Sequence, residues 1–356
     1  MFNYDRCATW VRHLRNATCK IKEKSMKLKY LMITIAATGI LTAGATQAKE
    51  LKLSAAPPPG SPWGAVTTEF VKKVAEVSEG KLVVVPYLGG KLGSEQDVIK
   101  QIARGRIDIG VMSNTAVSLL VPEFGLLASP FAFDNTAQAD CVADKHLLKT
   151  FGDDFAKAGV RGLSWMEVGY QVIFSKTPIR VPSDLKGMKV RTAPAATDTL
   201  YIKVAGGTAV PLSPSDGVPA MKTGQVEAAT QLSVFGVATG YDKVGPQITL
   251  TRHQHQVGAV VISAQTWSSL SEQEKEWLNA AAPTFLKLRD AIRGAEGALL
   301  GKAKKDGATV IDLSDAELGQ WRALAPKAQE MILDDLGAKA RPRWDQINEA
   351  KLACAK

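Results

Sequence analysis

PSDLKGMKVRT, residues 182–192, predicts a short helical turn, a glycine stop and then a β-strand. The Ser-Asp pair can cap the turn, and Gly187 can adopt the left-handed conformation that ends it. Residues 188–192 alternate apolar and polar side chains, which is typical of a strand. The strand carries Arg191 to its carboxyl end, where open α/β sheets bind ligands. A guanidinium is a two-pronged donor for carboxylate or phosphate, so we expect Arg191 to anchor a ligand; a surface ion pair is the alternative.

Strands and helices alternate at short spacing on both sides of this stretch. Strands are predicted at residues 51–55, 81–87, 107–112, 160–168, 172–175, 189–192, 208–212, 225–230 and 257–263. Helices are predicted to begin at caps such as Ser61 and Ser94, and capping boxes at Ser271 and Ser314 precede long C-terminal helices. This alternation is typical of an α/β protein with a parallel sheet covered by helices on both faces.

The first 48 residues differ in composition from a globular domain. Lys27 and Lys29 precede an uncharged stretch, residues 30–48, that ends in small residues. This pattern is typical of a secretory signal peptide cleaved near Ala48. Its strongly apolar part, residues 31–41, is shorter than the ~20 residues of a membrane-spanning helix, which is the alternative interpretation. We therefore expect residues 1–48 to be an N-terminal extension and signal peptide, and the protein to be periplasmic.

Most of the net charge of +9 lies in the same segment. Residues 1–48 hold eight Lys and Arg against Asp5 and Glu23, which leaves about +3 for the rest of the chain. The basic composition therefore gives no argument for nucleic-acid binding. Two cysteines remain after residue 48, Cys141 and Cys354. Export permits a disulfide between them if their Cα atoms come close enough, and two unpaired thiols are the alternative.

The motifs of common enzyme and metal sites are missing from the sequence. It has no HExxH, CxxC, Gly-x-Ser-x-Gly, P-loop or complete dinucleotide fingerprint. His253 and His255 are two potential ligands where zinc requires three or four, so we interpret them as exposed or strand-edge side chains. Ser183 and Lys186 have the spacing of a serine acyl-enzyme motif, but capping explains the serine. We expect no enzymatic activity, no metal and no cofactor; an exported enzyme on an α/β scaffold is the alternative.

The segment DLKGMKVR at residues 184–191, preceded by PIRVP, resembles the signature of the DctP-like family, the periplasmic solute-binding proteins of TRAP transporters for C4-dicarboxylates and other organic acids. SEGK at 78–81, LGSE at 92–95, GRIDIG at 105–110 and PFAF at 130–133 resemble other segments of that family. The resemblance covers nearly all of the chain after residue 48.

The resemblance implies an α/β, two-lobed periplasmic-binding-protein fold of type II-like topology. A ligand cleft would lie between the lobes, and a long helix would span both. Lobe I is expected at residues 49–168 plus about 257–296, and lobe II at 169–256 plus about 297–356. The implied function is to capture a small carboxylate by lobe closure and deliver it, as a monomer, to TRAP membrane permease subunits. A protein of the same fold that serves a sensor or another importer is the alternative.

Within the resemblance, Arg191 is the arginine that forms a salt bridge to the substrate carboxylate. Gln171 stands where the family has a second arginine, and Gln231 stands where it has an asparagine. Glutamine brings no charge, so these departures favour a ligand with a single carboxylate and neutral polar groups over a dicarboxylate. Further ligand-binding candidates come from their positions at the ends of predicted elements: Trp63, Glu95 and Asn114. Packing between lobes is the alternative for Trp63, and capping of its own helix is the alternative for Glu95.

Overall fold

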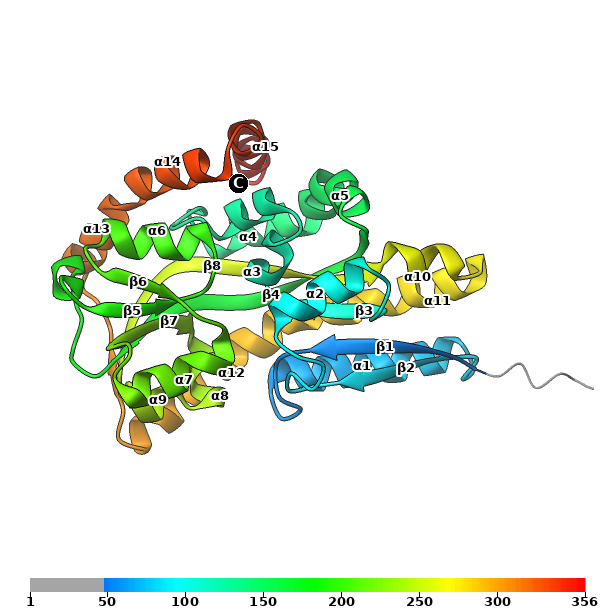
Figure 1. The fold of residues 1–356 in the computed structure, drawn as a ribbon, viewed down its shortest axis with the longest axis horizontal. Coiled ribbons are helices and arrows are strands. Elements are labelled where there is room, and N and C mark those ends of the chain that lie inside the picture. The colour runs from blue at the N-terminus through cyan, green and yellow to red at the C-terminus, as the bar shows by residue number, and fades with distance from the viewer. Residues whose placement is uncertain (1–47, 356) are drawn as a thin grey trace, which may run out of the picture. The chain divides into compact units, whose positions relative to one another are not determined.

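The computed structural model describes residues 48–355 (Figure 1). Residues 1–47, which hold nearly all of the expected signal peptide, lie outside this range. Within residues 48–355, no helix has both the length and the apolar character that crossing a membrane requires. The strands are β1 Lys49–Ala55, β2 Leu82–Tyr87, β3 Ile109–Met112, β4 Val160–Ser175, β5 Lys189–Thr192, β6 Thr208–Pro211, β7 Ala228–Leu232, β8 Gln247–Ser263 and β9 Thr309–Ile311.

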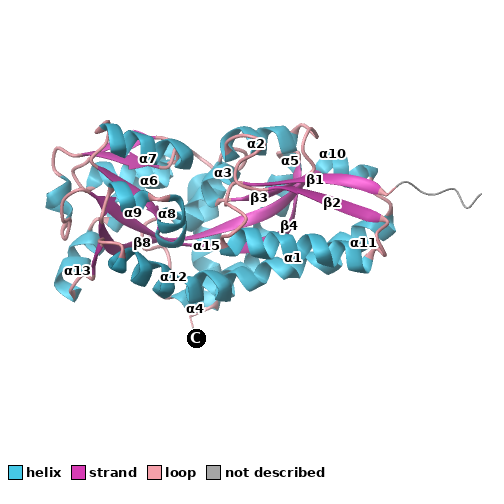
Figure 2. Cartoon of the chain, turned by 90° about the horizontal axis from the view of Figure 1, so that it is seen from below, coloured by secondary structure: helices cyan, strands magenta, loops and turns pink. Residues whose placement is uncertain are grey.

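Helices cover both faces of the sheet that these strands form (Figure 2). The α-helices are α1 Pro62–Val77, α2 Glu95–Ala103, α3 Asn114–Ser118, α4 Thr136–Val142, α5 Leu148–Lys157, α6 Ala196–Val204, α7 Pro214–Thr223, α8 Ser233–Thr239, α9 Tyr241–Val244, α10 Ala264–Ser269, α11 Glu272–Ala281, α12 Leu288–Lys305, α13 Asp315–Ala323, α14 Ala325–Leu336 and α15 Ala340–Ala353. Four further helical segments are η1 Pro122–Ala128, η2 Ala143–Leu147, η3 Pro182–Leu185 and η4 Ala282–Lys287.

The sheet has the strand order β2-β1-β3-β8-β4-β7-β5-β6, and β9 pairs with β8. The groups β2-β1-β3 and β7-β5-β6 are parallel, as the sequence predicts. The expectation of a fully parallel sheet is wrong, because β8 runs antiparallel to β3 and β4, and β4 runs antiparallel to β7. The strands predicted at 160–168 and 172–175 are one strand, β4, and the strand predicted at 257–263 is the end of β8.

Strands β4 and β8 join two lobes (Figure 1). Strand β3 pairs with residues 259–262 of β8, whereas β7 pairs with residues 171–175 of β4, so the two parallel groups lie at opposite ends of the long pair. Each group has its own apolar core, around Phe70 in the first lobe and around Tyr201 in the second. The described residues form one compact unit, and the lobe boundaries expected from the sequence stay a prediction.

A continuous helical path from α11 through η4 to α12 follows the two lobes. Pro283 lies where α11 gives way to the 3-10 segment η4, because proline lacks the N–H that an α-helical ladder needs. Helix α12 packs against α1 and β4 in the first lobe and against α8 and β9 in the second. This path is the long helix spanning both lobes that the family resemblance implies.

The stretch 182–192 folds as predicted. The carboxylate of Asp184 accepts hydrogen bonds from the backbone N–H groups of Arg180 and Val181, at 2.8 and 3.0 Å, and so fixes the turn η3. Gly187 has a φ of 80°, the left-handed conformation that ends the turn without steric cost. Strand β5 then runs between β6 and β7 and places Arg191 opposite Val210 of β6 and Ala229 of β7.

The C-terminal helices return across both lobes. Helix α14 packs on α6, and α15 packs on α4 and η1. Cys354, at the end of α15, forms a disulfide with Cys141 of α4, with a Cα–Cα distance of 5.8 Å. Of the two states that the sequence left open for these cysteines, the structure has the bridge.

Candidate functional site

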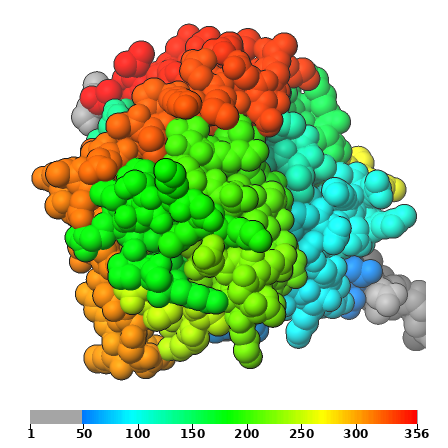
Figure 3. Space-filling model, turned by 60° about the vertical axis from the view of Figure 1, so that its left-hand side comes forward, coloured from blue at the N-terminus to red at the C-terminus, as the bar shows by residue number. Residues whose placement is uncertain are grey.

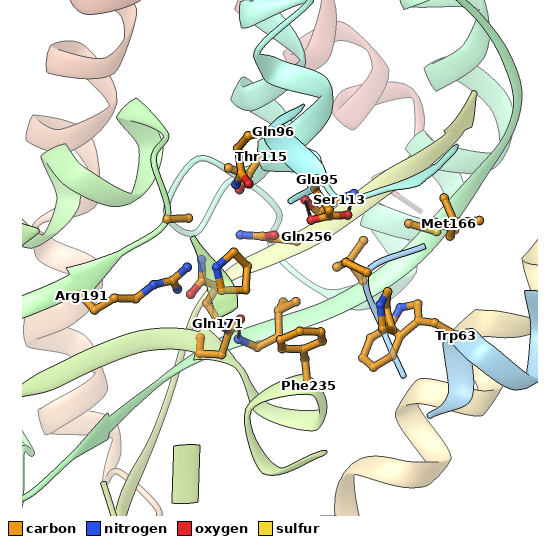
Figure 4. A pocket seen from close by; sticks show the side chains of 18 residues that line it. Trp63, Glu95, Gln96, Ser113, Thr115, Met166, Gln171, Arg191, Phe235 and Gln256 are labelled. Carbon is orange, nitrogen blue, oxygen red and sulfur yellow. Dashed lines mark hydrogen bonds between the residues drawn. The ribbon is translucent and has the colours of Figure 1, made fainter. Parts of the chain in front are cut away.

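A pocket lies between the lobes, and five of the six predicted ligand-binding residues line it (Figure 4). They are Trp63 at the start of α1, Glu95 at the start of α2, Gln171 in the middle of β4, Arg191 at the end of β5 and Gln231 in β7. The cavity has a volume of about 60 Å³, which is room for several water molecules. The sequence therefore indicates residues that line this pocket from both lobes, and their contact with a ligand stays a prediction.

The mouth of the pocket opens between the lobes. An outer cavity shares Glu95, Gln96 and Phe235 with the pocket and is lined by the loop at residues 89–93 and by Ser213 to Ser215 at the start of α7. Figure 3 looks onto the second lobe and shows its yellow-green residues meeting cyan residues of the first lobe along a seam.

Asn114 is not part of the pocket lining. It is almost fully buried, and its Nδ2 donates a hydrogen bond to the backbone oxygen of Phe124 at 3.0 Å. The position of Asn114 directly after β3 is as predicted. Because Ser113 caps a helix there, Asn114 becomes the first residue of α3, and its side chain joins α3 to η1.

Arg191 is 1% exposed and is held by backbone oxygens. Its Nε and Nη2 both donate to Leu212 O, at 3.1 and 2.7 Å, and its Nη1 donates to Thr230 O at 2.9 Å. A guanidinium has five N–H groups, so one N–H on each terminal nitrogen remains for a ligand. Burial lowers the pKa of Arg191, and Tyr241, Asp198 and Asp216 act in the opposite direction.

Two glutamines present neutral groups next to this cation. Gln171 donates through Nε2 to Asp198 Oδ1 at 2.8 Å and to Gln254 Oε1 at 3.1 Å, and its Oε1 is buried without a partner. Gln231 accepts a hydrogen bond from Leu232 N through its Oε1, and its Nε2 is buried without a partner. Unmatched buried polar atoms are rare in folded proteins. Here they offer an acceptor and a donor on the wall of the pocket.

Trp63 closes one side of the pocket. Its side chain is buried, its indole N–H donates to Glu167 O at 3.3 Å, and its ring meets the ring of Phe235 edge to face at 6.2 Å. Since α1 and α8 belong to different lobes, Trp63 is at once a pocket wall and a contact between lobes. The packing between lobes that its sequence position allowed is present, and its contact with a ligand stays a prediction.

Glu95 is engaged within its own lobe. Its carboxylate accepts hydrogen bonds from the backbone N–H of Ser113 at 3.0 Å and from its hydroxyl at 2.8 Å. Burial raises the pKa of Glu95, and the two hydrogen bonds from Ser113 oppose the rise. The cap of α2 is Ser94 rather than Glu95, because the Ser94 hydroxyl accepts from Asp97 N. Glu95 thus joins the start of α2 to the end of β3 at the pocket.

Comparison with known proteins identifies the family of this chain. Residues 53–334 match the family described as bacterial extracellular solute-binding protein, family 7 (DctP). The chain belongs to this family. A curated solute-binding protein of Chromohalobacter salexigens is 26% identical over 82% of this chain and 85% of its own length. The 2,3-diketo-L-gulonate-binding periplasmic protein YiaO of Escherichia coli is 25% identical over 78% of this chain and 86% of its own.

Solved structures of family members have the same fold. A TRAP periplasmic solute-binding protein of Roseobacter denitrificans with bound β-D-glucuronate has a TM-score of 0.78 and 25% identity, over 84% of this chain and 99% of that one. The sugar acid binding protein DctPAm of Advenella mimigardefordensis in complex with galactonate has a TM-score of 0.79 and 25% identity, over 85% and 98%. The predicted family, two-lobed fold and function as a TRAP-transporter solute-binding protein for small organic acids are therefore confirmed.

Sequence reasoning missed several residues at the site of this family 7 protein. Gln96, Thr115, Phe235 and Gln256 line the pocket, and Asp198 and Gln254 lie directly behind Gln171. One signal was present: Gln254 and Gln256 stand two residues apart, which places both side chains on one face of β8. A polar pair on a buried strand indicates a site rather than a core.

The two histidines of β8 are buried, so the expectation of exposed or strand-edge side chains is wrong. His255 Nε2 lies 2.8 Å from Glu167 Oε1, and His253 Nδ1 lies 2.7 Å from Thr251 Oγ1. Their part of β8 pairs with β4, and their rings stack on Tyr170 and Tyr201, which explains their burial. Among residues 48–355, no group of three or more His, Cys, Asp or Glu side chains is arranged to hold a metal ion.

Proposed function

We propose that this protein binds a sugar acid with one carboxylate, an aldonate or a hexuronate, and delivers it to the membrane permease subunits of a TRAP transporter. The observation that carries the proposal is Arg191, the one cation among the described residues that line the pocket. Its two remaining N–H groups match the two oxygens of a carboxylate. The surrounding amides of Gln171 and Gln231 match hydroxyl groups, which both donate and accept hydrogen bonds.

The lining also fits the rest of such a ligand. Trp63 and Phe235 give the pocket apolar surface for the C–H face of a carbon chain or ring. Glu95 adds a buried carboxyl group that would repel a second ligand carboxylate. The relatives with bound β-D-glucuronate and galactonate support the same class of ligand.

The ligand would act by stabilising a closed arrangement of the lobes. Arg191 and Gln231 come from the second lobe, and Trp63 and Glu95 come from the first, so a ligand that contacts both sides binds the closed form more tightly than the open form. Strands β4 and β8, which connect the lobes, would bend during closure. We further propose that the protein is exported by a signal peptide cleaved near Ala48, acts as a periplasmic monomer and releases its ligand chemically unchanged.

The test is a matched set of three ligands. D-glucuronate has one carboxylate, D-glucuronamide replaces it with a neutral amide, and D-glucarate adds a second carboxylate; D-galactonate is the fourth probe. We expect a monocarboxylate at a hundred times its Kd to add about 2.7 kcal/mol of stability, a shift of several degrees in Tm. D-glucuronamide should give no shift and D-glucarate a smaller one. Equal stabilisation by the amide would refute the anchor, and no stabilisation by any acid would refute the ligand class.

Arg191→Met tests the anchor directly. Loss of two charge-assisted hydrogen bonds should weaken binding of the preferred acid on the order of 100-fold, measured by isothermal titration calorimetry. Arg180→Met is the matched control, because Arg180 lies in the same lobe, is exposed, and pairs with Glu317 away from the pocket. The control should keep the wild-type affinity. An Arg191→Met protein with unchanged affinity would contradict the proposal.

A further inference from the structure

Asp198 is a buried carboxylate that does not line the pocket. It is 1% exposed, and its Oδ1 accepts hydrogen bonds from Gln171 Nε2 at 2.8 Å and from Thr230 Oγ1 at 3.2 Å. No Lys, Arg or His of the described chain forms an ion pair with it. Burial raises the pKa of Asp198 to about 6, while the charge of Arg191 and the hydrogen bonds from Thr230 and Gln171 lower it. Burying a carboxylate without an ion pair costs free energy of folding, so we looked for a function that Asp198 performs at this position.

Asp198 and Gln254 together fix the amide of Gln171. Each takes one hydrogen of Gln171 Nε2, at 2.8 and 3.1 Å. Gln254 is itself fixed, because its Nε2 donates to Thr197 O at 3.1 Å and its Oε1 also accepts from Gln256 Nε2 at 3.2 Å. A carboxylate only accepts hydrogen bonds. A reversed Gln171 amide would therefore place its oxygen against two other acceptor oxygens, so the observed orientation is the stable one.

This orientation decides what Gln171 offers to a ligand. Both N–H groups of the side chain are occupied, and Oε1 is the remaining atom, buried and without a partner on the pocket wall. Gln171 and Arg191 both line the pocket and are labelled in Figure 4. Thr230 links Arg191 to the partner of Gln171. Its carbonyl accepts a hydrogen bond from Arg191 Nη1, and its hydroxyl donates to Asp198 Oδ1, which also accepts from Gln171.

We propose that Asp198 and Gln254 are positioning residues that make Gln171 an obligate hydrogen-bond acceptor, which selects ligands with a hydroxyl group on one of the two carbons nearest the carboxylate. The inference rests on the proposed function, since Arg191 must hold that carboxylate. A hydroxyl donates to Gln171 Oε1. A hydrogen, a carbonyl or an ether oxygen at the same place leaves Oε1 unpaired in a closed pocket. Hydroxy acids are thereby preferred over their deoxy and keto counterparts.

The measured quantity is the ratio of the Kd of a deoxy analogue to the Kd of its parent acid. The probes are D-galactonate with its 2-deoxy and 3-deoxy analogues or, if the protein binds D-glucuronate more tightly, D-glucuronate with its 4-deoxy analogue. Sites built to hydrogen-bond a hydroxyl reject analogues that lack it. We expect a ratio of roughly 10 to 100 for one of these analogues in the wild-type protein, measured by calorimetry.

Three variants separate the roles. Gln171→Met removes the acceptor, and the ratio should fall to about 1. Asp198→Ala frees one hydrogen of the Gln171 amide without touching the ligand, and the ratio should fall at least about threefold, because the amide can then turn. Gln254→Met frees the other hydrogen and serves as the second variant if Asp198→Ala does not fold. Asp216→Ala is the matched control: its charge also influences Arg191, but it bonds Ser213 and does not contact Gln171, so the ratio should keep its wild-type value.

Each outcome decides a separate point. If Asp198→Ala and Gln254→Met weaken parent and deoxy acids by the same factor, the two residues are structural only and the positioning role is refuted. If the wild-type protein binds the deoxy analogues as tightly as the parent, Gln171 does not select a hydroxyl, although the binding of acids over amides still supports the proposed function. If no acid binds, or the amide binds equally well, the proposed function and this inference both fail.

Discussion

Two clusters of polar side chains, each with one member on β4, use their hydrogen bonds differently. The pocket cluster consists of Gln171, Arg191, Asp198 and Gln231; the β4–α12 cluster consists of Asp140, Glu167, His255 and Arg293. In the β4–α12 cluster, Glu167 is paired on both oxygens, with His255 at 2.8 Å and with Arg293 at 2.9 Å. Arg293 also holds Asp140 through two bonds of 2.8 and 2.6 Å.

In the pocket cluster the one cation, Arg191, makes no such ion pair and is held by backbone oxygens. Charges that meet opposite charges within the fold stabilise one arrangement of helices and strands. The spare donors of Arg191 are the groups to which our proposed function assigns the ligand carboxylate. The comparison predicts that changes in the β4–α12 cluster alter stability and leave ligand selection unchanged.

The largest effect on stability is expected from reduction of the disulfide. Its Cys141 is the neighbour of Asp140 on α4, so the bridge holds the same helix as the β4–α12 cluster. The bridge to Cys354 closes a loop with a sequence separation of 213 residues. Loops of this length give the upper range of disulfide stabilisation, so reduction should lower the free energy of unfolding by about 4 kcal/mol. Urea unfolding with and without dithiothreitol measures the loss. The Cys141→Ser/Cys354→Ser double variant should unfold at the lower urea concentration under both conditions.

Binding distinguishes the two clusters in the same experiment. The reduced protein, at a temperature where it remains folded, should bind its preferred sugar acid with the affinity of the oxidised protein. A parallel loss of affinity and stability would show that the pocket depends on the anchoring of α4, and the separation of the two clusters would be wrong.

A smaller loss of stability is expected from Glu167→Ala. The substitution leaves His255 and one side of Arg293 without the buried carboxylate, but Arg293 is partly exposed and keeps Asp140. The loss should therefore be about 2–3 kcal/mol, below that of a fully buried pair. Thermal unfolding measures it, and Glu167→Gln is the milder control because an amide can still bond both partners. A changed preference between D-glucuronate and D-glucuronamide in the alanine variant would contradict the comparison.

The sequence is informative about the pocket where one local pattern fixes a position. Gly187 ends the turn and the alternation after it forms β5, so the placement of Arg191 at a strand end follows from nearby residues. The end of β5 determines the position of the Arg191 backbone but not the hydrogen-bond partners of its side chain. These partners, the carbonyls of Leu212 and Thr230, lie 21 and 39 residues away in the sequence. The partners of Arg191 are set by tertiary structure alone.

Local sequence patterns did not predict the full length of strand β8. Its first half contains polar residues from His253 to Gln256, which resemble a loop when neighbours are unknown. They are buried because β4 pairs with this part of β8. Their side chains also form hydrogen bonds: Gln254 with Gln171, and His255 with Glu167. For Asn114 the local pattern predicted a pocket residue where there is none. Its place after a strand suggested the pocket, but Ser113 caps α3 there and the Asn114 side chain bonds Phe124 instead.

The smallest effect is expected from His253, which lies two residues from His255 on β8 and belongs to neither cluster. His253 stacks on Tyr201 with ring centroids 5.1 Å apart, and burial lowers its pKa to about 3. In the unfolded chain its pKa returns to about 6.5. The unfolded state therefore binds a proton below pH 6.5 that the folded state refuses, and stability that is present above pH 6.5 is lost as the pH falls toward 3.

Between pH 7 and pH 5 this loss should be about 2 kcal/mol, since each pKa unit corresponds to ~1.4 kcal/mol. His253→Gln keeps a polar partner for Thr251 and does not titrate, so the variant should lose about 2 kcal/mol less than the wild-type protein over the same range when urea unfolding is measured at both pH values. The difference between the two proteins cancels every other titrating group. An equal pH dependence in both proteins would show that His253 also accepts a proton in the folded state, and the expected effect of its burial would be wrong.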